Sequence, residues 1–264
     1  MATHIRPTPG PGLRWIVKRK RQDLLLLDFG LLHLEEGESL RDGTKEEEAV
    51  IHIFGGSCTI KGDDFEFKKV GDRGDVFDGK ASAAYIPPRT HFSVHAVSRL
   101  SAAIFKAATS TGGSPQIIRP KDVRVYEVGQ KNWLRQVHHV GVDNLESKAL
   151  LFGETFNPPG NWSSYPPHKH DTPNPPHEAK MEELYFYRVH PPHGFGLQRV
   201  YTADGYNQVF VVEDGDVVTL PRGYHPVVSA PGYELYYFWV LAAFSERRML
   251  FQDDPKHGWL KETR

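Results

Sequence analysis

Cysteine, net charge and long apolar runs are all scarce in this sequence. Its one cysteine, Cys58, cannot form an internal disulfide, and the chain starts without the pattern of a secretory signal, so we expect a protein of the reducing cytoplasm. Positive residues (32) nearly balance negative ones (33) without a long block of one sign, which argues against nucleic acid or a membrane surface as partner. The most apolar early segment, residues 24–34, contains Asp28 and His33 and is too short to span a bilayer.

Turn-forming residues are abundant by contrast, with 24 glycines and 20 prolines spread along the chain. Between them lie short runs of aromatic and β-branched residues, separated by turn signals such as Asp204-Gly205. This pattern is typical of an all-β sandwich or barrel. Helical periodicity is weak, and only residues 46–51 and 245–252 would support short helical turns.

A change of composition at residues 109–115 predicts a domain boundary, because small and polar residues replace the strand pattern there. We therefore expect an N-terminal barrel over residues 1–110 and a C-terminal barrel over residues 111–264. The halves look like copies of one plan, since Glu48 opens an apolar strand in the first and Glu183 opens one in the second.

The C-terminal half carries a candidate metal site. His168 and His170 are two residues apart, so in an extended strand both imidazoles point to the same face. Glu183 heads the next strand, and His225 follows a proline-glycine turn that returns the chain to the barrel mouth. Three imidazoles and a carboxylate would hold one divalent ion (Zn, Mn, Fe, Co or Ni) with open coordination positions. No His-x-His precedes Glu48, so we expect the first barrel to be metal-free.

Four segments of the C-terminal half are distinctive: GETFNPPGNWSSYPPHKHD (153–171), MEELYFY (181–187), QRVYT (198–202) and PRGYHPV (221–227). They closely resemble one known family, the 5-deoxy-glucuronate isomerases of myo-inositol catabolism. The N-terminal half is similar more loosely, through VFDGK (76–80) and YIPP (85–88).

The resemblance implies two tandem cupin β-barrels and the aldose–ketose isomerisation of 5-deoxy-D-glucuronate to 5-dehydro-2-deoxy-D-gluconate. It also implies a relationship to the ketol-isomerases of pectin breakdown, whose metal ligands are His, His, Glu and His. A proline-rich insert separates Glu183 from His170 here, which departs from the general cupin spacing and leaves Glu178 and Glu182 as rival ligands.

Such an isomerase needs a base beside the carbon that loses its proton. Glu154, Tyr185 and Tyr187 are the candidates, and a structural role is as reasonable for each of them. Glu183, Tyr185 and Tyr187 share one face of their strand by alternation.

The carboxylate of a sugar acid needs a cation as well. Arg222 is our first choice because it lies three residues before His225, with Arg199 and Arg188 as alternatives. Arg222 could equally pair with a neighbouring acid such as Asp216. Trp162 and Asn161 are candidates for a wall of the substrate pocket.

Other functions remain compatible with the same ligands. A uronate ketol-isomerase of pectin breakdown and an iron-dependent cupin dioxygenase are the enzymatic alternatives, and a non-catalytic sugar-binding cupin is the third. The partner in the favoured interpretation is a small sugar acid, and a homo-oligomer is possible.

Overall fold

The computed structural model describes residues 1–261, and strands make up almost all of its regular structure. The helices of the described part are three short 3-10 turns: Pro120–Asp122, Lys131–Trp133 and Gly258–Lys261. The all-β prediction is therefore confirmed. None of the helices in residues 1–261 is long and apolar enough to cross a membrane.

The two helical turns expected from the sequence are wrong. Residues 47–51 belong to strand β5 (Glu47–Gly55), and residues 245–251 are irregular up to β23 (Gln252–Asp253). Every residue of β5 after Glu47 is buried, so side chains on both faces of the strand are covered. Such a strand lacks the alternation of polar and apolar residues that would mark it in the sequence.

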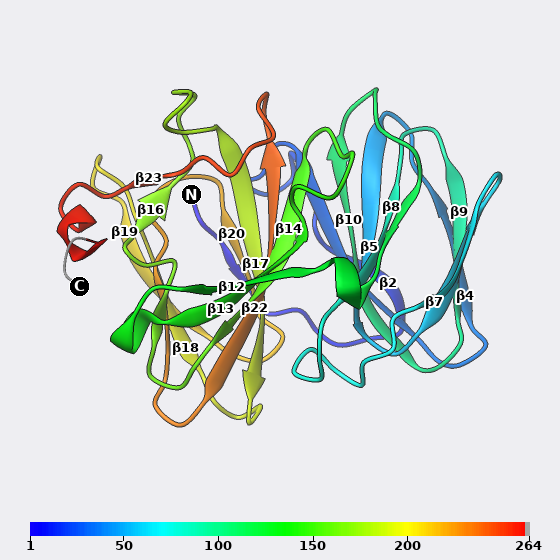
Figure 1. Cartoon of the computed structure of the whole chain (residues 1–264), viewed down its shortest axis with the longest axis horizontal. Coiled ribbons are helices and arrows are strands. Elements are labelled where there is room, and N and C mark those ends of the chain that lie inside the picture. Colours follow the sequence, from blue (N-terminus) through cyan, green and yellow to red (C-terminus); the bar gives the residue numbers. More distant parts are fainter. Residues whose placement is uncertain (262–264) are drawn as a thin grey trace. The chain divides into compact units, whose positions relative to one another are not determined.

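The chain forms two compact units, and each recruits a segment from outside its main stretch (Figure 1). The first unit comprises Thr8–Arg124 and His139–Leu151; the second comprises Met1–Pro7, Val125–His138 and the chain from Phe152 on. Residues 109–115 are irregular, as expected of a connection. A single cut after residue 110 would nevertheless separate both units from residues that belong to them.

The first unit consists of two antiparallel sheets. The six-stranded sheet has the order β11 (Gln116–Ile118), β8 (Ser82–Ile86), β5, β10 (Leu100–Ala108), β3 (Leu27–Leu34) and β2 (Gly12–Val17). The four-stranded sheet has the order β4 (Ser39–Gly43), β9 (His91–Ala96), β6 (Cys58–Gly62) and β7 (Glu66–Val70). Their inner faces enclose an apolar core that includes Ile51, Ile53, Val94 and Ile104.

The second unit repeats this plan. Its large sheet has the order β1 (His4–Ile5), β20 (Val217–Leu220), β17 (Met181–His190), β22 (Glu234–Ala243), β14 (Leu150–Asn157), β13 (Arg135–Gly141) and β12 (Arg124–Val128). A four-stranded sheet contains β15 (Trp162–Ser163), β21 (Val227–Ser229), β18 (Gly196–Tyr201) and β19 (Asn207–Val212). Strand β16 (His168–Lys169) pairs with β23.

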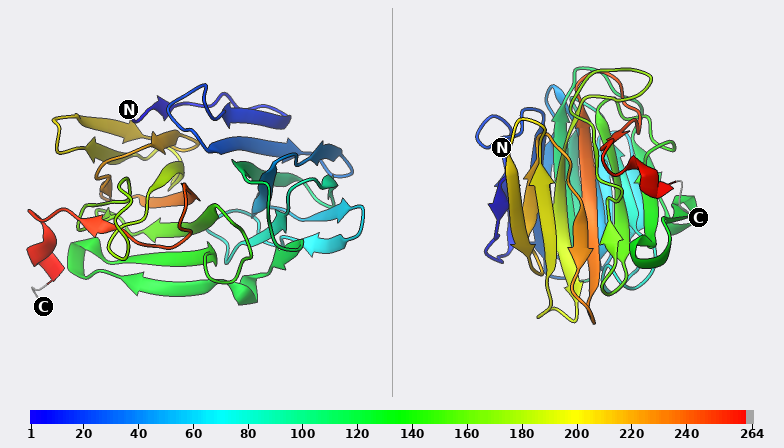
Figure 2. Two further views of the ribbon diagram at one scale, coloured as in Figure 1. Left: turned by 90° about the horizontal axis from the view of Figure 1, so that it is seen from above. Right: turned by 90° about the vertical axis from the view of Figure 1, so that its left-hand side faces the viewer.

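A short strand forms one edge of each large sheet, and in the second unit it comes from the other end of the chain. In the first unit β11 pairs with β8, and in the second unit β1 pairs with β20 through His4↔Val218. Figure 2 shows the blue N-terminal segment beside gold strands from the C-terminal half of the sequence. The N-terminal residues are thus part of the unit that carries the candidate site.

Candidate metal centre

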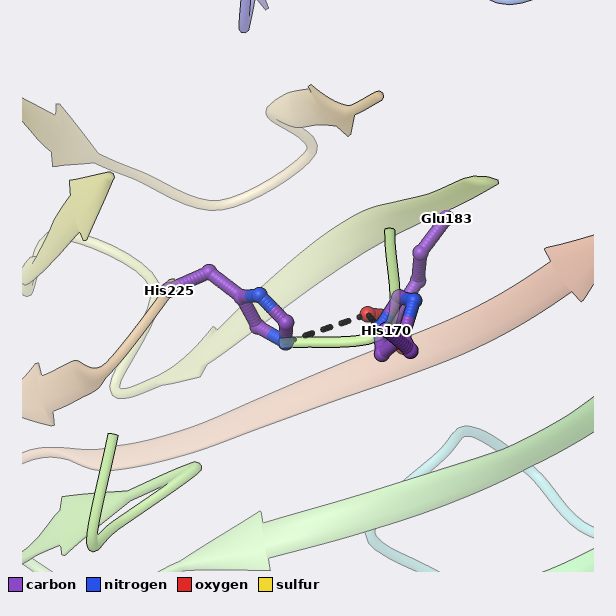
Figure 3. Close-up of side chains that lie close together, drawn as sticks. All are labelled: His170, Glu183 and His225. Carbon is purple, nitrogen blue, oxygen red and sulfur yellow. Dashed lines mark hydrogen bonds and ion pairs between the residues drawn. The ribbon is translucent and has the colours of Figure 1, made fainter. Parts of the chain in front are cut away.

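His170, Glu183 and His225 meet inside the second unit (Figure 3). One potential ligand atom from each lies within 4.8 Å of the others, and all three residues are buried. Glu183 Oε2 is 3.0 Å from His170 Nε2 and 3.3 Å from His225 Nε2. Strand β17 carries Glu183, whereas His170 and His225 lie just beyond β16 and in the turn after β20, so three separate segments build the cluster.

Backbone carbonyls fix the orientation of both imidazoles. His170 Nδ1 donates to the Met181 carbonyl (3.1 Å), and His225 Nδ1 donates to the Gly223 carbonyl (2.9 Å). Because a carbonyl only accepts, both rings carry a proton on Nδ1, and each presents its Nε2 toward Glu183. The buried Nε2 of His225 has no hydrogen-bond partner. Orientation of a histidine ligand by its second nitrogen is the usual arrangement at metal sites, so these residues fit a divalent ion.

Charge and burial affect the two histidines differently. Burial lowers the pKa of His225 below its ordinary value, and the negative charge of Glu183 offsets this only in part. Burial also acts to lower the pKa of His170, but the hydrogen bond and the charge of Glu183 outweigh it, so the pKa of His170 is raised. Glu183 thus lies close to Nε2 of both rings, an arrangement in which one cation could be held by all three residues.

His168 lies next to the cluster. Its ring centroid is 4.9 Å from that of His225 and 6.5 Å from that of His170. Burial, followed by the neighbouring histidines, holds the pKa of His168 well below its usual range, so the ring is neutral. The structure thus brings all four sequence-predicted ligand residues into one region, with three of them in direct mutual range.

The two rival glutamates do not reach the cluster. Both oxygens of Glu178 accept from the Lys169 ammonium (2.8 and 2.9 Å), and Oε1 also accepts from the Asp171 and Thr172 amides. Glu182 precedes Glu183 in β17, so its side chain points to the opposite face of the sheet.

Strand register shows which residue of the first unit corresponds to Glu183. In the second unit, Glu183 lies opposite Leu220, the residue before the proline of the turn. In the first unit, the residue before the corresponding proline is Ile86, and it lies opposite Ala49. The equivalent of Glu183 is therefore Ala49 rather than Glu48, which was the correspondence expected from the sequence. Glu48 instead accepts from Ser147 Oγ (2.7 Å) and from neighbouring amides.

The side chains that face the interior at corresponding positions differ between the two units. Ile51 and Ile53 follow Ala49 on the core face of β5, whereas Tyr185 and Tyr187 follow Glu183 on β17. Tyr185 lies with its ring centroid 5.9 Å from that of His225, which confirms the predicted common face. The apolar first unit and the tyrosine-lined second unit are thus divergent copies of one fold.

Hydroxyl groups form a buried network beside the cluster. Ser164 Oγ contacts the hydroxyls of Tyr185 (2.9 Å) and Tyr237 (3.4 Å), and Tyr187 donates to Gln198. Burial raises the pKa of Tyr185 and Tyr187 well above the ordinary value. Both phenols are therefore protonated at neutral pH, so they can donate hydrogen bonds but cannot act as the base.

Glu154, the third candidate base, lies on the other face of the large sheet. Its Oε1 accepts from Tyr236 (2.8 Å), and Tyr236 alternates along β22 with Tyr237, which faces Tyr185. The structure therefore does not bring Glu154 to the cluster. Its face depends on how β14 pairs within the sheet, which sequence alone does not show.

The three arginines expected to bind a carboxylate are engaged elsewhere. Their partners are Asp204 for Arg222 (3.0 Å), Asn207 for Arg199 (2.9 Å) and Asp214 for Arg188 (2.8 Å). Arg222 and Asp204 are both substantially exposed. Arg222 thus pairs with an acid, as the alternative role has it, but the acid is Asp204 and not Asp216, which lies 2.7 Å from His4.

The pocket-wall candidates have backbone and aromatic contacts. Asn161 donates to the Leu134 carbonyl (2.8 Å), which holds two loops together. The ring of Trp162 lies 5.5 Å from that of Tyr165. Sequence reasoning missed Arg135, a buried arginine at the start of β13 whose guanidinium donates to the Tyr165 carbonyl (3.0 Å). Its sequence signal was weak, because it lies outside the motif segments.

Two barrels, with a buried histidine–glutamate cluster in one of them, define a bicupin protein with a candidate metal centre in its second barrel. The chain belongs to the KduI/IolB family, whose model matches residues 8–260. It is 39% identical over 238 residues to the 5-deoxy-glucuronate isomerase of Geobacillus kaustophilus, covering 89% of this chain and 86% of that protein. The Bacillus subtilis (strain 168) enzyme of the same name is 35% identical over 249 residues, with 93% and 92% covered.

Solved structures agree with the assignment of the fold. An IolB-like protein from Salmonella typhimurium LT2 superposes with a TM-score of 0.93 at 31% identity and covers 98% of both chains. Oxalate decarboxylase from Bacillus subtilis superposes with a TM-score of 0.65 at 14% identity over 96% of this chain and 79% of the other. The second likeness is one of fold alone, and it confirms the tandem cupin architecture.

Proposed function

We propose that this chain is an aldose–ketose isomerase that converts 5-deoxy-D-glucuronate to 5-dehydro-2-deoxy-D-gluconate in myo-inositol catabolism. The observation that carries the proposal is the buried cluster of His170, Glu183 and His225 in a member of a family whose curated relatives are 5-deoxy-glucuronate isomerases. We further propose that it acts in the cytoplasm on a small sugar acid, and that it assembles as a homo-oligomer.

One divalent ion is the proposed cofactor, held by His168, His170, Glu183 and His225. When bound, it would supply Lewis-acid polarisation of the substrate carbonyl. Zinc, manganese, iron, cobalt and nickel all suit a set of imidazole and carboxylate ligands. The first unit has Ala49 in the register position of Glu183, which supports a single site per chain.

The chain's own residues would orient the substrate. Tyr185 is the proposed hydrogen-bond donor to a substrate oxygen, because its hydroxyl is protonated, buried and beside His225. Ser164 would keep that hydroxyl in place through the bond between the two oxygens (2.9 Å). Glu154 is not the proposed base, because it lies on the other face of the sheet. Tyr187 has a supporting role, since its hydroxyl donates to Gln198.

An assay of the purified protein with 5-deoxy-D-glucuronate tests the function. The keto product should form without oxygen consumption, activity should fall when a chelator removes the ion, and it should return when a divalent metal is added back. Oxygen uptake with substrate would support a dioxygenase instead. Faster turnover of a uronate from pectin breakdown would shift the proposal to that ketol-isomerase.

Elemental analysis tests the metal site separately. The wild type should contain about one ion per chain, whereas a His168→Ala/His170→Ala variant should contain little. Near-stoichiometric metal in the double variant would exclude this site.

A further inference from the structure

Arg135 is a buried cation in the second unit that the site described so far does not use. It is only 8% exposed, although arginine is rarely buried without a partner. Its hydrogen bonds run from Nη1 to the carbonyls of Tyr165 (3.0 Å) and Trp133 (3.2 Å), with a longer contact to Val128 (3.5 Å). Its Nε is buried and has no hydrogen-bond partner.

The positive charge of Arg135 is not balanced by a carboxylate. Within residues 1–261 its guanidinium bonds only to carbonyl oxygens, whereas Arg188 and Arg222 on the surface each pair with an aspartate. Burial lowers the pKa of Arg135, but a guanidinium keeps its proton in proteins. A buried and unpaired cation is costly, which makes it a strong attractor for an anion.

The side chain faces the interior of the barrel, as strand alternation shows. His138, three residues further along β13, packs against Phe156 and lies 3.8 Å from Glu154, on the face away from the cluster. Arg135 therefore points to the opposite face, which is that of Tyr237.

The position of Arg135 relative to the metal ligands follows from its bond to Tyr165. The neighbouring residue, Ser164, contacts the hydroxyls of Tyr185 and Tyr237, and Tyr185 in turn lies beside His225. The segment after Tyr165 leads to His168, three residues further along the chain. Arg135 is thus bonded to the segment that connects the tyrosine hydroxyls with the first histidine of the cluster.

We propose that Arg135 binds the carboxylate of the sugar acid whose aldehyde end lies at the histidine–glutamate cluster. All three carbonyl contacts use Nη1, so the edge formed by Nε and Nη2 is left for an anion. This edge offers two parallel N–H groups, the geometry that a carboxylate accepts best. The inference rests on the proposed function and replaces Arg222 as the expected carboxylate ligand.

Two compounds and a pair of arginine variants test the proposal. The compounds are 5-deoxy-D-glucuronate and its neutral analogue, in which a hydroxymethyl group replaces the carboxylate. The readout is the ratio of their kcat/KM values, because a loss of folded or metal-loaded protein lowers both values equally and leaves the ratio unchanged. Arg135→Gln should lower the preference for the acid roughly ten- to a hundredfold, and Arg135→Lys, which keeps the charge but not the planar edge, should lower it less.

Arg124→Gln is the matched control, because Arg124 begins the neighbouring strand β12 and its side chain is 61% exposed. It should keep the wild-type ratio. If Arg135→Gln also keeps that ratio, or if Arg222→Gln loses it, the proposal is overturned.

The experiment distinguishes a failure of the proposed function from a failure of the assignment of Arg135. A wild type that isomerises neither compound would reject the function, and calorimetric binding of both compounds to the metal-loaded protein would then decide on Arg135. Tighter binding of the acid in the wild type, lost in Arg135→Gln, supports the assignment. Equal binding of both compounds by the wild type, or no binding of the acid, overturns it.

Discussion

Two adjacent glutamates, Glu182 and Glu183, illustrate how strongly alternation separates side chains in this barrel. Both are buried, yet only Glu183 points toward His170 and His225. A single position along the strand therefore decides whether a carboxylate can take part in the proposed metal site.

Replacing Glu183 should remove the metal while replacing its neighbour should not. Glu183→Gln keeps the side-chain volume but exchanges an anionic ligand for a weak neutral one, so metal content should fall from about one ion per chain to a small fraction. Glu182→Gln is the matched control and should retain the ion. Elemental analysis after dialysis measures both, and equal losses would contradict the assignment of Glu183.

The sequence predicted this part of the site because its signals are local. The spacing of His168 and His170 and the alternation from Glu183 to Tyr187 needed no knowledge of strand pairing. Glu154 and Arg135 were different, since their faces depend on how β13 and β14 pair in the large sheet. Proximity in sequence favoured Arg222, which lies three residues from His225 but in an exposed turn.

Cys58 should be chemically inert in the folded protein. Its thiol is fully buried in the core of the first unit, and burial raises its pKa from 9.0 to about 12. At pH 8 this lowers the thiolate fraction roughly a thousandfold, so disulfide reagents should react very slowly until the protein is denatured. Titration with and without guanidinium measures the difference, and rapid stoichiometric reaction of the native protein would contradict it.

Among the elements, the insert between His170 and Glu183 is anchored by one carboxylate. Glu178 is buried, and it holds the Lys169 ammonium together with two backbone amides. Asp171 links the same segment to the turn of His225 by accepting from the Gly223 amide (2.8 Å). The unusual spacing of the ligands is thus accommodated by a hydrogen-bonded loop.

Glu178→Gln should loosen this loop without removing a metal ligand. The loss of a buried anion from Lys169 and two amides should lower the free energy of unfolding by about 1–3 kcal/mol. Glu246→Gln, at an exposed pair with Arg248, is the control and should change little. Urea denaturation of the metal-free proteins measures both, and equal midpoints would show that Glu178 does not anchor the insert.

The all-β class was predictable from local sequence signals, whereas the pairing of the strands into sheets was not. Turn residues and short apolar runs gave the all-β class, but β5 is buried on both faces and lacked a clear period. Nothing in residues 1–7 indicated that they pair with β20, because their partner lies at the other end of the sequence.

At the scale of the whole molecule, each unit includes a segment that is separated in sequence from its main stretch, and residues 1–7 are such a segment of the second unit. Deleting residues 1–7 should destabilise the second unit by about 2–4 kcal/mol, since it removes the Thr3–Thr219 backbone bond (3.0 Å) and the contact of His4 with Asp216 (2.7 Å). Chemical denaturation measures the loss. Arg6→Gln, whose side chain is 60% exposed, is the control, and an unchanged midpoint in the truncated protein would contradict the role of β1.

The pairing of β1 with β20 also limits when the second unit can complete its large sheet during synthesis. Thr3 and its partner Thr219 are 216 positions apart, so at about 5–20 residues per second the ribosome needs roughly 10–40 seconds to make the second after the first. The first strand of the chain thus waits, unpaired, while the whole first unit is made. The barrel with the candidate metal centre closes its edge only after nearly every strand has been translated.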